Sequence, residues 1–95
     1  MITIIAKRYV KADKIEEFKT LACDLVAASQ NEEGCISYGL YQDMQNPQIL
    51  TFIEIWRNQA AIDAHNSSSH FNDIVPQMAH LLEEKAPVEL YTRVI

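Results

Sequence analysis

The stretch ILTFIEIWRNQAAIDAH, Ile49 to His65, decides the fold of this 95-residue chain. Its first half is rich in β-branched and aromatic residues that alternate between two faces, which is typical of a strand. Glu54 and Trp56 stand on this otherwise apolar strand, and a short helix that bears His65 follows at once. The acid and the indole therefore either hold the fold together or take part in chemistry.

Outward from this stretch, residue periodicity and turn signals predict four strands. They are expected at residues 2–10, 35–44, 49–57 and 88–95, with a turn at 45–48 that makes the second and third strands a hairpin.

Two helical sections separate these strands. Apolar residues at helical spacing predict a helix from Asp13 to about Gln30, with Asp13 and Glu16 as a capping box and Gly34 as its left-handed end. The second section is split, with a short helix capped by Asn58 and a longer one that begins in the segment NSSSH at residues 66–70 and contains a proline.

The resulting order, β-α-β-β-α-β, predicts a ferredoxin-like α+β fold, in which both helical sections cover one face of an antiparallel sheet. Residues 1–95 are expected to form a single domain. Both faces of the first and third strands are largely apolar, and the helices can cover only one of them. We therefore expect a homodimer, with the uncovered faces of two sheets packed together.

Composition excludes several partners. Eight Lys and Arg against thirteen Asp and Glu give a net charge of −5, so the chain lacks the basic patch that nucleic acids or anionic membranes require. No apolar run approaches the length of a membrane span, and the first ten residues do not resemble a signal peptide. Two cysteines are too few for a disulfide scaffold, so a reducing, cytoplasmic location is expected.

Standard catalytic and cofactor motifs are absent. The chain contains no glycine-rich phosphate loop, no G-x-S-x-G and no H-E-x-x-H. His65, His70 and His80 are five and ten residues apart, a spacing that does not stack two ligands on one helical face. Neither a metal site nor a cofactor site is therefore expected.

Three residues of the opening stretch admit both a structural and a functional interpretation. Glu54 either forms an ion pair with Lys7, Arg8 or Arg93 on a neighbouring strand, or is a pocket acid with a raised pKa. Trp56 is either a core side chain or a stacking platform for a substrate. His65 is either an ordinary histidine at a helix end or a neutral imidazole that accepts a phenolic proton.

The segments NEEGCISYGLYQD (31–43) and FIEIWRNQAAIDAHNSSSHF (52–71) together resemble the antibiotic biosynthesis monooxygenase family of dimeric α+β barrels. Family members show E-x-G-C-x-x-Y, then E-x-W, A-H and a Ser-containing stretch before H-F. In this chain the matching residues are Glu32, Gly34, Cys35, Tyr38, Glu54, Trp56, His65, Ser69, His70 and Phe71.

The resemblance implies a cofactor-independent monooxygenase that oxidises a small phenolic or quinol-type substrate with O₂. His65 would be the catalytic base, and the residues expected to contact the substrate are Tyr38, Glu54, Trp56, His70 and Phe71. A haem-degrading branch uses an Asn–Trp–His trio, but the corresponding residues here are Lys7, His65 and Val75. Two alternatives stay open, namely an isomerase acting on a small phosphorylated sugar and a small-molecule-binding barrel without turnover.

Overall fold

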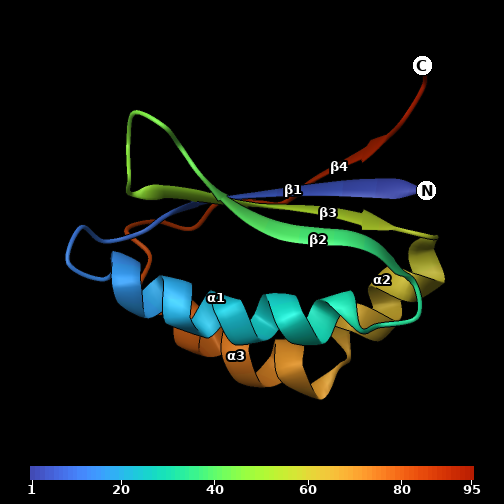
Figure 1. The fold of residues 1–95 in the computed structure, drawn as a ribbon, viewed down its shortest axis with the longest axis horizontal. Coiled ribbons are helices and arrows are strands. Elements are labelled where there is room, and N and C mark those ends of the chain that lie inside the picture. Colours follow the sequence, from blue (N-terminus) through green and yellow to red (C-terminus); the bar gives the residue numbers. More distant parts are fainter.

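A four-stranded antiparallel sheet with its helices on one face forms the protein, as a computed structural model of residues 1–95 describes it (Figure 1). The elements in chain order are β1 (Ile2–Tyr9), α1 (Ile15–Gln30), β2 (Cys35–Gln42), β3 (Ile49–Trp56), α2 (Gln59–Asn66), α3 (Ser69–Ala79) and β4 (Glu89–Thr92). The strands lie in the order β2-β3-β1-β4. This arrangement confirms the predicted ferredoxin-like α+β fold.

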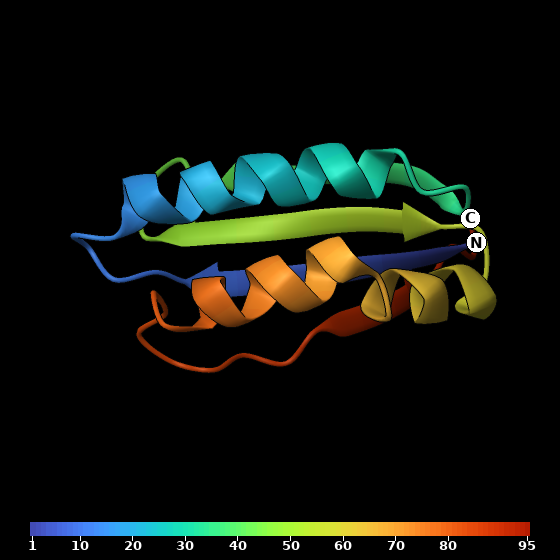
Figure 2. The ribbon, with the colours of Figure 1, turned by 90° about the horizontal axis from the view of Figure 1, so that it is seen from below.

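The helices divide the inner face of the sheet between them. Seen from the helical side, α1 runs along the β2–β3 half, whereas α2 and α3 run along the half formed by β1 and β4 (Figure 2). None of the three helices is long and apolar enough to cross a membrane.

Strand β3 shows the alternation that its sequence predicts. Its even-numbered residues, Leu50, Phe52, Glu54 and Trp56, are all buried against the helices. Its odd-numbered isoleucines are only partly buried and lie on the opposite face, where Ile53 pairs with Ile5 of β1. The core therefore lies between the sheet and the helices, with the acid and the indole inside it.

Two of the predicted helix caps are confirmed. The side chain of Asn58 accepts a hydrogen bond from the backbone N–H of Ala61 at the start of α2, and Ser68 does the same for Phe71 at the start of α3. Helix α3 runs through Pro76 to Ala79. The caps matter because they separate α2 from α3 and so set the direction of each.

Helix α1 ends at Gln30 as predicted, but the features predicted to flank it are wrong. A turn closed by the bond from Lys14 N to Lys11 O precedes the helix, which therefore begins at Ile15 without a side-chain cap from Asp13. Gly34 does not have a positive φ. A β-carbon at Gly34 would lie 2.2 Å from the β-carbon of Ala61, so this glycine permits the close approach of α2 instead.

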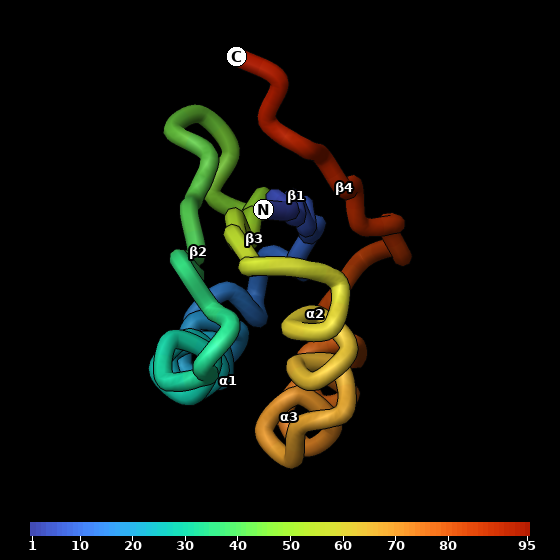
Figure 3. Tube along the Cα trace, turned by 90° about the vertical axis from the view of Figure 1, so that its right-hand side faces the viewer, coloured from blue at the N-terminus to red at the C-terminus, as the bar shows by residue number.

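The outer face of the sheet carries no helix, and the C-terminal segment after β4 extends away from it (Figure 3). This face presents partly buried isoleucines of β1 and β3 together with Tyr41 and Tyr91, which are 55% and 52% exposed. Strand β4 is shorter than predicted and exposed throughout. The predicted apolar outer face is thus present.

Candidate active site

A cavity of about 740 Å³ lies between the inner face of the sheet and the helices, with residues of α1, α2 and α3 in its lining. Fifteen of its 21 lining residues are hydrophobic, and the segment from Leu82 to Leu90 forms part of its wall. Its size is that of a pocket for a small organic molecule, and its lining favours one that is largely apolar.

Four of the predicted site residues, Tyr38, Glu54, His65 and Phe71, line this cavity. Trp56 and His70 do not. Trp56 is fully buried behind the wall, with its ring 4.5 Å from that of His65 between centroids. Trp56 thus supports the wall residue His65 from behind, whereas His70 contacts Glu32 outside the wall.

Glu54 is a buried carboxylate without the ion pair that the sequence led us to expect. No Lys or Arg lies within ion-pair distance of it; its partner is Trp56, whose Nε1–H donates to Oε1 at 2.9 Å. Burial raises the pKa of Glu54 to about 6, although the Trp56 hydrogen bond and the more distant charge of Arg8 both oppose the rise. The pocket-acid interpretation fits this environment better than the ion-pair interpretation.

Tyr38 pairs directly with Glu54 across the β2–β3 ladder. Burial, and then the charge of Glu54, raise the pKa of Tyr38 far above its usual value. The phenol therefore stays protonated at every physiological pH and can donate a hydrogen bond to a group in the cavity. Tyr41 is exposed on the other face of β2, as the spacing predicts.

His65 combines deep burial with one strong hydrogen bond. The ring is 2% exposed and lies against Trp56, Tyr38 and Phe71, and its Nδ1 is 2.6 Å from Oε2 of Glu32. Burial is the largest effect on the pKa of His65 and lowers it, while Glu32 opposes the shift. The imidazole is consequently neutral at pH 7.

The partner on Nδ1 fixes the tautomer of His65. A carboxylate accepts a proton, so we assign the N–H to Nδ1 and the lone pair to Nε2. The Nε2 atom of His65 has no protein partner. It is not fully buried either, because Ser29 Oγ is the only fully buried side-chain polar atom that lacks a partner. Nε2 therefore keeps some contact with open space, and the ring to which it belongs lines the cavity.

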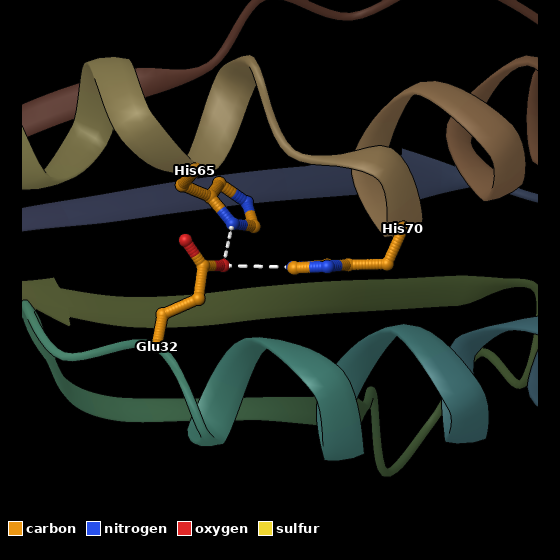
Figure 4. A group of neighbouring side chains, drawn as sticks. All are labelled: Glu32, His65 and His70. Carbon is orange, nitrogen blue, oxygen red and sulfur yellow. Dashed lines mark hydrogen bonds and ion pairs between the residues drawn. The ribbon is translucent and has the colours of Figure 1, made fainter.

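Glu32 entered the sequence-based prediction only as a member of the E-x-G-C-x-x-Y motif, without a role in the site. It lies between α1 and β2, and its Oε2 is 2.6 Å from His65 Nδ1 and 2.9 Å from His70 Nε2 (Figure 4). The histidine spacing excludes a metal site only if both rings lie on one helix. In the structure His65 lies on α2 and His70 on α3. Ser68 caps α3 and also donates to the carbonyl of His65, so the break between the helices brings the two rings to one carboxylate.

The comparisons with known proteins agree with this architecture. The profile of the family described as "Antibiotic biosynthesis monooxygenase" matches residues 1–77. The protein sll1783 of Synechocystis is 37% identical over 90 residues, which are 95% of this chain and 61% of that protein. "Putative monooxygenase YcnE" of Bacillus subtilis is 34% identical over 90 residues, 95% of this chain and 93% of YcnE.

A solved structure has the same fold over nearly the whole chain. The crystal structure of a conserved protein from Methanosarcina mazei superimposes with a TM-score of 0.95 at 38% identity, and the match covers 98% of this chain and 92% of that one. Since this chain spans about three fifths of sll1783, the similarity concerns one part of that longer protein.

Proposed function

The chain belongs to the antibiotic biosynthesis monooxygenase family, and we propose that it is a cofactor-independent monooxygenase that oxidises a small phenolic or quinol-type substrate with O₂. The observation that carries the proposal is the neutral His65 imidazole, whose Nδ1 is held by Glu32 while Nε2 has no protein partner and the ring lines an apolar cavity. This is the arrangement of an oriented general base.

The reaction begins with removal of the phenolic proton by His65 Nε2. The resulting imidazolium keeps its Nδ1–H on the Glu32 carboxylate, which stabilises the new positive charge. The electron-rich phenolate passes one electron to O₂, and the two radicals combine at a ring carbon. The imidazolium protonates the resulting peroxide. The ring carbon then loses its hydrogen as a proton while the O–O bond breaks, so the inner oxygen stays as a quinone carbonyl and the outer one leaves as water. The substrate thus supplies all four electrons that reduce O₂, and no further reductant is needed.

The rest of the cavity positions the substrate and excludes water. Tyr38 presents a hydroxyl that stays protonated, and Glu54 lies opposite it on the next strand. A fixed donor beside a buried base orients the substrate oxygen, and the apolar lining strengthens each polar interaction by lowering the local dielectric. In this proposal Glu32 and Trp56 are positioning residues, because they act through His65 and Glu54.

We further propose that two chains pair through the outer faces of their sheets. The support is the apolar character of that face, with Ile5 and Ile53 adjacent on neighbouring strands and Tyr41 and Tyr91 largely exposed. Pairing would remove this surface from water. Light scattering at micromolar concentration is expected to give the mass of a dimer, and a stable monomer would overturn this part of the proposal.

One observation favours a second candidate, an isomerase acting on a small phosphorylated sugar. Arg8 and Lys85 both line the cavity, and two cations can hold a phosphate. Isomerisation needs proton transfer but no oxygen, so the two candidates differ in their requirement for O₂.

Oxygen uptake tests the proposal. Metal-stripped protein is offered hydroquinones, catechols and naphthols in an oxygen electrode, with uptake by substrate alone subtracted. We expect uptake proportional to enzyme, and a fall in kcat of about 10²- to 10⁴-fold in His65→Ala, the usual contribution of general base catalysis. The matched control is His80→Ala, at the C-terminal cap of α3. A kcat of His65→Ala equal to that of the parent protein would refute the assignment of His65 as the base. Turnover of a sugar phosphate without oxygen would favour the isomerase.

A further inference from the structure

Beyond this proposed base chemistry, we infer that Glu32, His65 and His70 form a binding site for a divalent transition-metal ion of the Zn²⁺ class. One carboxylate oxygen and two imidazole nitrogens of these residues all lie within 4.8 Å of one another. They come from three separate segments and converge on one point (Figure 4). We name this set the Glu32–His65–His70 cluster.

The spacing of the ligand atoms suits a metal ion. Zinc binds His nitrogen and carboxylate oxygen at about 2.0–2.2 Å, which puts two ligands of a tetrahedral ion roughly 3.3–3.6 Å apart. The two contacts of Glu32 Oε2 are 2.6 Å and 2.9 Å. Opening each Glu32 contact by roughly 0.4–1.0 Å would bring it into this range, and the nitrogens of His65 and His70 lie within 4.8 Å of each other.

The ligand types select the class of ion. Two imidazoles and one carboxylate make the His₂Glu set that zinc enzymes use, and it leaves a position open for water or another ligand. Calcium and magnesium prefer sets built from oxygen, so they should bind poorly here. The set carries one negative charge when both histidines are neutral, and a divalent ion would leave a local charge of +1.

Access and support also fit a binding site. The side chains of Glu32 and His70 are 15% and 20% exposed, so an ion can enter from the surface, whereas His65 is 3% exposed and is fixed by its aromatic neighbours. Ser68 holds the turn between the two histidines by bonding to the carbonyl of His65 and the N–H of Phe71. Two of the three ligands are thus accessible and the third is rigidly placed.

Metal binding would change the tautomers of both histidines. A metal on Nδ1 of His65 requires the lone pair there, so the single proton of the neutral ring moves to Nε2. His70 binds through Nε2, so its proton, which faces the Glu32 carboxylate on Nε2 in the metal-free cluster, moves to Nδ1. If His65 is the base of the proposed oxygenase, the ion blocks it, because Nε2 is then already protonated. The cluster would therefore act as a site at which a transition metal inhibits the enzyme.

Direct metal titration tests the site without reference to activity. Metal-stripped protein carrying Cys23→Ser, which removes an exposed thiol, is titrated with Zn²⁺ by calorimetry and with Co²⁺ by visible absorption. We expect one ion per chain, with the intense visible bands of low-coordinate Co²⁺. His70→Gln should bind at least ~100-fold more weakly, since even an outer-shell partner is worth about 10–100-fold. His80→Gln should bind like the parent.

Two further readouts cover the case in which a variant folds poorly. Zn²⁺ should raise the melting temperature of the parent but not that of His70→Gln, because only a folded site binds the ion. In ¹⁵N spectra of the parent, Zn²⁺ should move the proton of His65 from Nδ1 to Nε2. Equal Zn²⁺ affinity in the parent and His70→Gln, or unchanged His65 tautomers with Zn²⁺ bound, would overturn the inference. A site that binds Zn²⁺ without affecting oxygen uptake would uphold the site and contradict only the inhibition.

Discussion

Replacing Glu54 by Gln should stabilise the protein at neutral pH, although the residue lies in the core. Glutamine has nearly the same shape and keeps a carbonyl oxygen that can accept the Nε1–H of Trp56. What it loses is the negative charge, which burial disfavours and which no adjacent cation compensates. The substitution thus separates the role of the charge from that of the side-chain volume.

The magnitude follows from the pKa. Burial raises the pKa of Glu54 to about 6 in the folded protein, from an ordinary value of 4.5. One pKa unit corresponds to about 1.36 kcal/mol, so ionisation costs the folded state about 2 kcal/mol relative to the unfolded chain. Because the folded pKa is the higher one, the free energy of unfolding is unaffected below about pH 4.5. It falls as the pH rises through 4.5 to 6 and then stays constant.

Urea denaturation of both proteins at equal concentration, from pH 4.5 to 8, measures this difference. The curves should coincide near pH 4.5, and Glu54→Gln should be more stable by about 1–2 kcal/mol above pH 7. Subtracting the two curves removes the contribution of every other titrating group. The remaining pH dependence then belongs to Glu54.

A variant that is less stable than the parent at neutral pH would refute this reasoning. That result would mean that the carboxylate stabilises the fold, through Arg8 or another donor, as the ion-pair interpretation of the sequence holds. If the prediction is confirmed, Glu54 is a charge kept at a cost to stability, which is typical of functional sites.

Two other substitutions test the packing around the site. Trp56→Phe leaves Oε1 of buried Glu54 without its donor and should lower the free energy of unfolding by about 1–3 kcal/mol, measured by urea denaturation; an unchanged value would show that the indole N–H is not needed. Gly34→Ala places a methyl group 2.2 Å from the β-carbon of Ala61 and should cost about 1–3 kcal/mol. The double variant with Ala61→Gly should recover most of that loss. If it does not, the loss of stability comes from the backbone at position 34 and not from contact with the Ala61 side chain.

The fold was predictable because its signals are local. Strict alternation along β3 assigned Phe52, Glu54 and Trp56 to one buried face, and the side chains of Asn58 and Ser68 capped the helices as their types indicate. Each inference needs only a residue and its neighbours along the chain. The apolar character of both sheet faces was visible for the same reason.

The candidate site was only partly predictable because it depends on contacts distant in sequence. The family motif marks Glu32 rather than its neighbour Glu33, but nothing in the sequence indicates that Glu32 reaches both His65 and His70. The histidine spacing was judged as if one helix carried both. A break at Ser67 and Ser68 changes the geometry, and its direction is set by tertiary packing.

Glu54 illustrates a second limit. Its burial followed from the alternation, but its partner did not, because several cations on neighbouring strands were available by sequence. The structure instead gives it Trp56, two residues further along the same face. A similar limit applies to Gly34, whose role comes from the approach of α2 rather than from a turn.

The most direct test of the account is whether His65 removes a phenolic proton in the cavity. Metal-free protein is mixed without oxygen with a phenol that supports uptake, and the absorption of the bound ligand is recorded at pH 7. We expect a phenolate spectrum with the parent protein and with His80→Gln, and a neutral phenol with His65→Gln. A phenolate bound to His65→Gln, or a neutral phenol bound to a parent protein that consumes oxygen, would contradict the central claim.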